Sequence, residues 1–86
     1  ARIVISIMVS EVLYYLLQGD PVAAEASVDL LRVHRPDLSQ NLIRRTRQKY
    51  LTMLDQLPVG YLDPTPFERF FDRHLDTDIE EQLLVN

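Results

Sequence analysis

The sequence contains no cysteine and no tryptophan, and its two glycines, Gly19 and Gly60, lie far apart. Without thiols the chain can form neither a disulfide framework nor a thiolate metal site, so packing or self-association has to stabilise it. Two isolated glycines cannot form a glycine-rich loop of the kind that holds nucleotide phosphates. These absences exclude disulfide-rich scaffolds and the common nucleotide-binding enzymes.

A long hydrophobic run is also absent. The uncharged stretch between Arg2 and Glu11 has eight residues, whereas a membrane-spanning helix needs about 20. Glu11 interrupts the apolar run, and the small-residue stretch 24–26 follows Asp20, which is not the arrangement of a signal peptide. We therefore expect a cytoplasmic or otherwise intracellular protein that does not associate with a membrane.

The composition is that of an ordinary globular domain, with 86 residues of which 47% are hydrophobic and 26% are charged. A chain of this length buries only about 60 to 65% of its unfolded surface. It can therefore enclose one modest core. We expect residues 1–86 to form a single helical domain.

The net charge of −4 is unevenly distributed along the chain. Residues 1–31 carry −3, residues 32–49 carry +5, and residues 50–86 carry −6. The basic block can pair with the acidic C-terminal block, within one molecule or across a dimer, or it can form a cationic surface that binds an acidic partner. The sequence leaves both interpretations open.

Segment 39–57 gives the clearest secondary-structure signal, because its apolar residues recur at helical spacing and most of its cations fall on the other side. The side chains expected to face inward are Leu42, Ile43, Thr46, Tyr50, Met53, Leu54 and Leu57. Those expected to lie opposite are Arg44, Arg45, Gln48, Lys49 and Gln56. The pattern predicts one long amphipathic helix with a basic face, ended by Pro58.

Capping signals place a helix before this one. The pair Asp20-Pro21 is a strong helix start, because the carboxylate can accept from exposed amides and proline at the first helical position loses no hydrogen bond. This helix is expected to run to about Arg35, since Pro36 stops it. Asp37 or Ser39 is then the expected N-cap of the long helix.

Two further capping signals follow. Segments 65–68 (Thr-Pro-Phe-Glu) and 77–80 (Thr-Asp-Ile-Glu) both match the capping-box pattern, in which a threonine is followed three residues later by a glutamate. They predict a helix that begins at Thr65 and a short C-terminal helix that begins near Thr77.

The first nine residues allow two interpretations. Segment 2–7 is rich in β-branched residues and is compatible with a strand that pairs with a second copy, as in a ribbon-helix-helix protein. Alternatively, the apolar run continues through Leu13 and Leu16 and forms one helix that ends at Gly19. We prefer the helix, because the chain offers no second strand for pairing.

The sequence thus predicts an all-α fold, a small bundle of four main helices plus a short C-terminal helix. The expected core residues are Leu13, Leu16, Leu17, Leu30, Leu42, Ile43, Tyr50, Met53, Leu54, Leu57, Phe67, Phe70, Phe71 and Leu75.

Side chains suited to catalysis are scarce. His34 and His74 are the only histidines, and neither lies in a recognisable catalytic motif. His74, Asp76 and Asp78 have the spacing of part of a calcium loop, but Glu81 stands where that loop requires glycine. We expect no enzymatic activity, no cofactor and no metal site, with the two aspartates acting as helix caps.

The basic segment suggests a nucleic-acid interface. Residues 33–45 partly resemble a helix-turn-helix, with a turn at 38–39 followed by outward amide and guanidinium side chains. Asp37 departs from this pattern, because the tight turn favours glycine there, and the acidic flanks oppose phosphate. The side chains expected to contact phosphate or an acidic partner are Arg35, Gln40, Asn41, Arg44, Arg45, Arg47 and Lys49.

The apolar and aromatic side chains exceed what a small four-helix core can enclose. The candidates for an apolar interface are Ile3, Ile5, Ile7, Tyr14, Tyr15, Leu51 and Phe67. We therefore predict a non-enzymatic protein-protein interaction or regulatory adaptor module that binds another protein or itself, with a homodimer expected. The alternative is a small helical DNA- or RNA-binding protein that uses the basic face of its third helix.

Overall fold

The computed structural model describes residues 4–75. This part of the chain forms four helices: α1 (Ile5–Leu17), α2 (Pro21–His34), α3 (Pro36–Gln56) and α4 (Thr65–His74). It contains no strand, so the prediction of an all-α fold with four main helices is confirmed. The short helix predicted near Thr77 lies outside the described residues.

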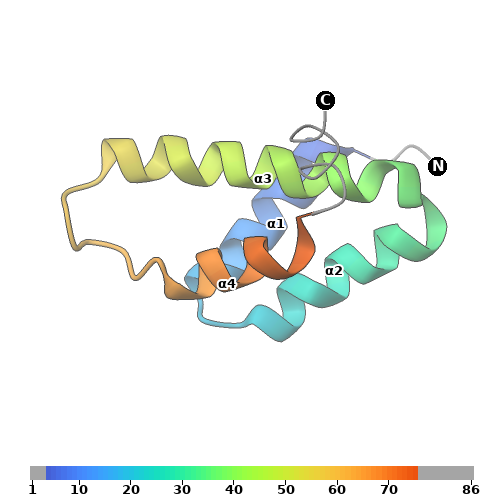
Figure 1. Ribbon diagram of the computed structural model, residues 1–86, viewed down its shortest axis with the longest axis horizontal. Coiled ribbons are helices and arrows are strands. Elements are labelled where there is room, and N and C mark those ends of the chain that lie inside the picture. The colour runs from blue at the N-terminus through green and yellow to red at the C-terminus, as the bar shows by residue number, and fades with distance from the viewer. Residues whose placement is uncertain (1–3, 76–86) are drawn as a thin grey trace, which may run out of the picture.

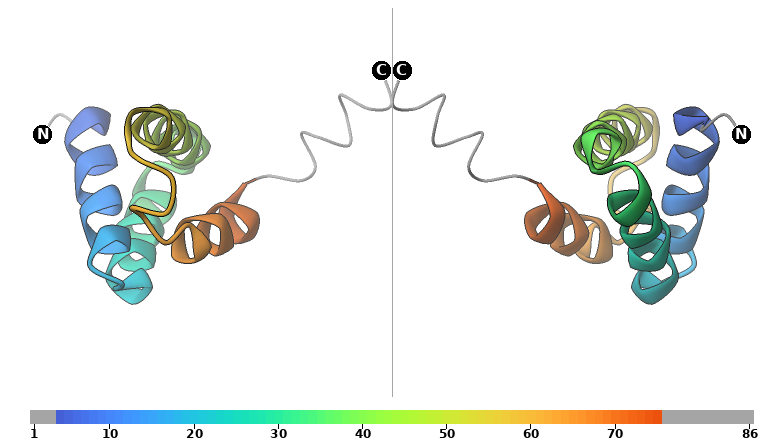
Figure 2. Two further views of the ribbon diagram at one scale, coloured as in Figure 1. Left: turned by 90° about the vertical axis from the view of Figure 1, so that its left-hand side faces the viewer. Right: turned by 90° about the vertical axis from the view of Figure 1, so that its right-hand side faces the viewer.

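The four helices are arranged in three layers. α2 and α3 meet at one end and diverge from there as a V (Figure 1). α1 packs on one side of this V and α4 lies on the other (Figure 2). Both outer helices contact both α2 and α3. The core therefore lies where the inward sides of α1 and α4 meet the V.

The junction of α2 and α3 consists of one residue, Arg35, instead of the turn expected at residues 38–39. Arg35 adopts φ −142° and ψ 71°, because a residue that precedes proline is disfavoured in the helical conformation. Pro36 then begins α3, where its fixed φ suits the first helical position. The predicted N-caps Asp37 and Ser39 are wrong, since both lie inside α3, and the helix-turn-helix outline loses its turn.

The N-terminal segment is helical from Ile5 onward. The alternative of a ribbon strand over residues 2–7 is therefore wrong, while Ile3 lies outside the described residues. Helix is favoured because Val9, Val12 and Leu16 recur at helical spacing and are buried together.

The turn between α1 and α2 follows the sequence prediction closely. Gly19 has φ +72°, and its amide donates to the carbonyl of Leu16 at 3.1 Å, while the amide of Asp20 donates to that of Tyr15 at 2.8 Å. This pair of hydrogen bonds is a Schellman motif. The predicted cap is confirmed, because the amide of Ala23 donates to Oδ1 of Asp20 at 3.1 Å.

The start of α4 was placed correctly, but its predicted cap is wrong. Thr65 is already the first helical residue and does not cap the helix. Instead, its amide donates to Oδ1 of Asp63 at 3.0 Å, and this bond lowers the pKa of the Asp63 carboxyl. Two residues further on, the ring of Phe67 stacks on that of Tyr50 with centroids 4.6 Å apart, which joins α4 to α3.

The core draws on all four helices. Its buried apolar residues are Val9, Val12, Leu13, Leu16, Ala24, Val28, Leu31, Leu42, Ile43, Tyr50, Phe67, Phe70 and Phe71. The predicted core residues that are only partly buried are Met53, Leu54, Leu57 and Leu75. Thr46 is fully buried and donates to the carbonyl of Leu42 at 2.7 Å, which satisfies its hydroxyl.

Two predicted core residues are exposed. Leu17 is 48% exposed and Leu30 is 61% exposed. α2 carries two apolar stripes, and its inward side is set by Ala24, Val28 and Leu31, which turns Leu30 outward. Leu17 is the last residue of α1, where the core no longer covers it.

The conformation of Gly19 gives a test of the α1–α2 turn. We expect Gly19→Ala to lower the free energy of unfolding by about 1 to 2 kcal/mol, because an L side chain is strained at positive φ. The added Cβ meets no atom within 4 Å, so the loss comes from the backbone alone. Gly19→Asn is the matched control and should lose less, since asparagine tolerates this conformation. Equal losses in urea denaturation would contradict this account.

Candidate interaction surfaces

Two of the predicted basic-face residues, Arg35 and Gln40, form hydrogen bonds within the molecule. Arg35 donates to both carboxylate oxygens of Asp37, at 3.1 and 2.9 Å, and the hydrogen bond from Arg35 lowers the pKa of that carboxyl. Gln40 is half-buried, and its amide donates to the backbone carbonyl of His74 at 3.0 Å. Gln40 therefore joins α3 to the end of α4 and does not lie on an open binding face.

Arg47 lies apart from the other α3 cations. It lines a groove of about 370 Å³ between α3 and α4, together with Glu68 and Asp72 of α4. The apolar part of this groove includes Leu51, which is 44% exposed as predicted. Two carboxylates beside Arg47 reduce the positive potential there, so Arg47 is poorly placed to attract an anion.

The remaining basic-face residues are Asn41, Arg44, Arg45 and Lys49, and all four are exposed. Within residues 4–75, none of these three cations forms an ion pair. Arg45 and Lys49 line a groove against the first turns of α1, while Arg44 does not. The expected basic face thus divides between two sides of α3, with Arg45 and Lys49 lining the groove against α1 and Arg47 lining the groove against α4.

The apolar interface candidates differ in how exposed they are in the structure. Ile7 and Tyr14 are exposed by 57% and 58%. Ile5 and Tyr15 are partly buried against the core. The assignment of Phe67 to an interface is wrong, because this side chain is 1% exposed and stacks on Tyr50.

The structure exposes apolar side chains on two helices that were not among the predicted interface residues. On α1, Leu17 joins Ile7 and Tyr14 on the outward side. On α2, the exposed apolar side chains are Val22, Ala26, Leu30 and Val33. The signal for the α2 surface was present in the sequence, since these residues recur at helical spacing. It could not be separated from the second stripe of the same helix, which forms the core.

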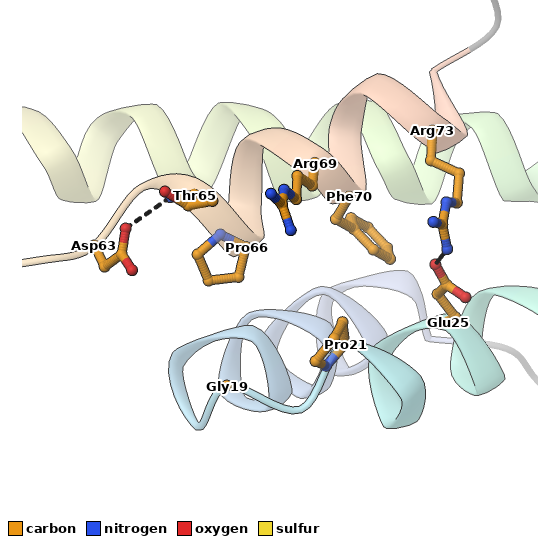
Figure 3. A pocket seen from close by; sticks show the side chains of 9 residues that line it. All are labelled: Gly19, Pro21, Glu25, Asp63, Thr65, Pro66, Arg69, Phe70 and Arg73. Carbon is orange, nitrogen blue, oxygen red and sulfur yellow. Dashed lines mark hydrogen bonds and ion pairs between the residues drawn. The ribbon is translucent and has the colours of Figure 1, made fainter.

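A cleft of about 350 Å³ lies between the start of α2 and α4 (Figure 3). Pro21 and Pro66 lie on opposite sides of it, and Phe70 lines it from the α4 side. Arg73 of α4 reaches across to pair with Glu25 of α2. This ion pair holds α4 against α2, whereas Asp63, which also lines the cleft, accepts from the amide of Thr65.

His74 lies beside this pair and is buried, with its ring 4.6 Å from that of Phe70. Arg32 donates to Nδ1 at 3.3 Å, and Nε2 lies 3.5 Å from a carboxylate oxygen of Glu25. Because arginine can only donate, the neutral ring accepts at Nδ1 and carries its proton on Nε2. Burial lowers the pKa of His74, Glu25 raises it and the charge of Arg32 lowers it, with a net lowering.

The side chains able to ligate a metal ion do not cluster within residues 4–75. No three histidine or acidic side chains there lie close enough to share a metal ion. Asp76 and Asp78, considered above as possible ligands, lie outside the described residues. None of the helices in the described part combines the length and the hydrophobicity needed to cross a bilayer.

Comparisons with protein-family models, with curated proteins and with solved structures find no significant match to this chain.

The buried histidine predicts a pH dependence of stability. Because its pKa is lowered on folding, the unfolded chain binds a proton more readily, so stability should be constant above about pH 6.5 and fall as the pH drops below it. In urea titrations between pH 7.5 and 5.5, His74→Gln should remove much of this slope, whereas His34→Gln, at an exposed site, should retain it. An unchanged slope in His74→Gln would show that other groups cause the dependence.

Proposed function

We propose that this protein is a non-enzymatic interaction module that self-associates through the outward side of α1. The observation that carries the proposal is the exposure of Ile7, Tyr14 and Leu17, each about half exposed, on a helix whose 13 residues include one charged side chain, Glu11. The outward side of α1 thus combines these apolar side chains with the exposed Ser10 and Glu11, and large apolar side chains exposed on one helix are candidates for burial by a partner.

The spacing of these residues suits a helix-to-helix contact. Tyr14 follows Ile7 by seven residues and Leu17 follows Tyr14 by three, so the three form a stripe on one side of α1, which Ser10 and Glu11 interrupt. Aromatic and branched aliphatic side chains supply most of the binding energy in protein interfaces. Two copies of the same stripe can pack against each other about a twofold axis, which is the commonest arrangement of homodimers.

The α2 surface adds a second binding site to this module. Val22 and Val33 are exposed by 76% and 77%, and Leu30 lies between them. Since α2 occupies a different layer from α1, the two stripes can serve different partners (Figure 2). We assign the α1 stripe to a second copy of the chain and the α2 stripe to an apolar helix of another protein, which is the behaviour of an adaptor.

The double variant Ile7→Glu/Tyr14→Glu tests the dimer. We expect at least a tenfold increase in the dimer dissociation constant, because each carboxylate would be buried in an apolar interface without a partner. Analytical ultracentrifugation over a range of concentrations measures this change. Val59→Glu is the control, since Val59 is fully exposed in the loop before α4 and should leave association unchanged. A wild-type chain that stays monomeric at high concentration would refute the proposal.

Nucleic-acid binding is the second candidate, and the unpaired state of Arg44, Arg45 and Lys49 in residues 4–75 favours it. If these three cations neutralise phosphates, log affinity for duplex DNA should fall with log salt at a slope of about −2.7. Fluorescence anisotropy at several salt concentrations measures this slope. Arg44→Glu/Arg45→Glu should abolish binding, while Arg69→Glu on α4 should not. Binding that is independent of salt would count against this candidate.

A further inference from the structure

The groove between α1 and α3 differs in its charge from the α2–α4 cleft and the α3–α4 groove described above. It has a volume of about 260 Å³ and is lined by Ser6, Val9, Arg45, Gln48, Lys49 and Thr52. No carboxylate lines it, although the protein as a whole carries −4. The cleft between α2 and α4 contains Glu25 and Asp63, and the groove between α3 and α4 contains Glu68 and Asp72.

The cations of the described residues are distributed in the same way. Arg32, Arg35 and Arg73 form ion pairs with carboxylates. Arg47 and Arg69 share their grooves with acidic side chains. Arg45 and Lys49 are the two that line a groove free of acidic side chains, so positive potential concentrates there.

The geometry of α3 brings these donors together. Arg45 and Lys49 are four residues apart, one turn along the same side of the helix, where side chains are neighbours. Gln48 also lines the groove and adds an amide donor. The hydroxyl of Thr52 already donates to the carbonyl of Gln48 at 3.0 Å, so it offers only an acceptor and helps to define the end of the groove.

We propose that this groove binds one phosphate group, either free or carried by a small phosphorylated molecule. Arg45 provides the planar fork that matches two phosphate oxygens, Lys49 a point charge, and Gln48 a neutral hydrogen bond. A small ligand fits better than a long polyanion, because the groove encloses only about 260 Å³ and the net charge of the protein is negative.

The experiment is a titration of the isotopically labelled protein with inorganic phosphate and, separately, with glycerol 3-phosphate, followed by two-dimensional NMR at constant ionic strength. We expect saturable shifts confined to the amides around Ser6, Arg45, Gln48 and Lys49. Arg45→Gln/Lys49→Gln should weaken binding at least tenfold. Arg44→Gln is the matched control, since it removes an exposed α3 cation that does not line the groove. Circular dichroism checks that each variant remains helical.

The two ligands distinguish the source of the phosphate. Tighter binding of glycerol 3-phosphate would indicate that the ligand is a phosphorylated small molecule. Equal binding of the two would indicate that it is the free anion. Both outcomes support the site. The proposal is overturned if the double variant binds like the wild type, or if sodium chloride alone produces the same shifts. It is also overturned if duplex DNA binds more than tenfold tighter per phosphate and Arg44→Gln weakens that binding as much as the double variant does.

Discussion

The steric restriction that Pro36 places on Arg35 underlies the arrangement of the four helices in residues 4–75. Proline ends α2 by excluding Arg35 from the helical conformation, and the same proline begins α3. With one residue between them, the two helices must meet at an angle, and they form the V to which α1 and α4 add one layer each (Figures 1 and 2). Each of the four helices therefore has an inward side and an outward side.

Because the domain is small, its core leaves apolar side chains of α1 and α2 exposed on the surface. A single core can cover only one side of α1 and of α2, and both helices carry apolar side chains on the other side as well. Contiguous apolar surface on a small domain is the usual mark of a partner. This is the physical basis for proposing an interaction module, with α1 and α2 as separate binding helices.

The distribution of charge follows the packing of α4. Because α4 lies along the V, its carboxylates Glu68 and Asp72 come next to Arg47, and its Arg73 reaches Glu25 of α2. The opposite side of α3 faces α1, which brings no carboxylate into their shared groove. The cations of one basic segment are thus divided between two grooves, one in which Arg47 lies with two carboxylates and one that Arg45 and Lys49 line without any.

Local sequence rules determined most of the backbone of this protein. Asp20, Gly19 and the proline positions fixed helix starts and stops, because capping and proline geometry act over a few residues. Helical periodicity also identified much of the core in α3 and α4. Tertiary structure alone decided which of two apolar stripes on α2 is buried, which side of α3 meets α4, and that Gln40 and His74 are joined. These outcomes depend on contacts between residues distant in the chain, and periodicity within one helix contains no information about which neighbour will cover it.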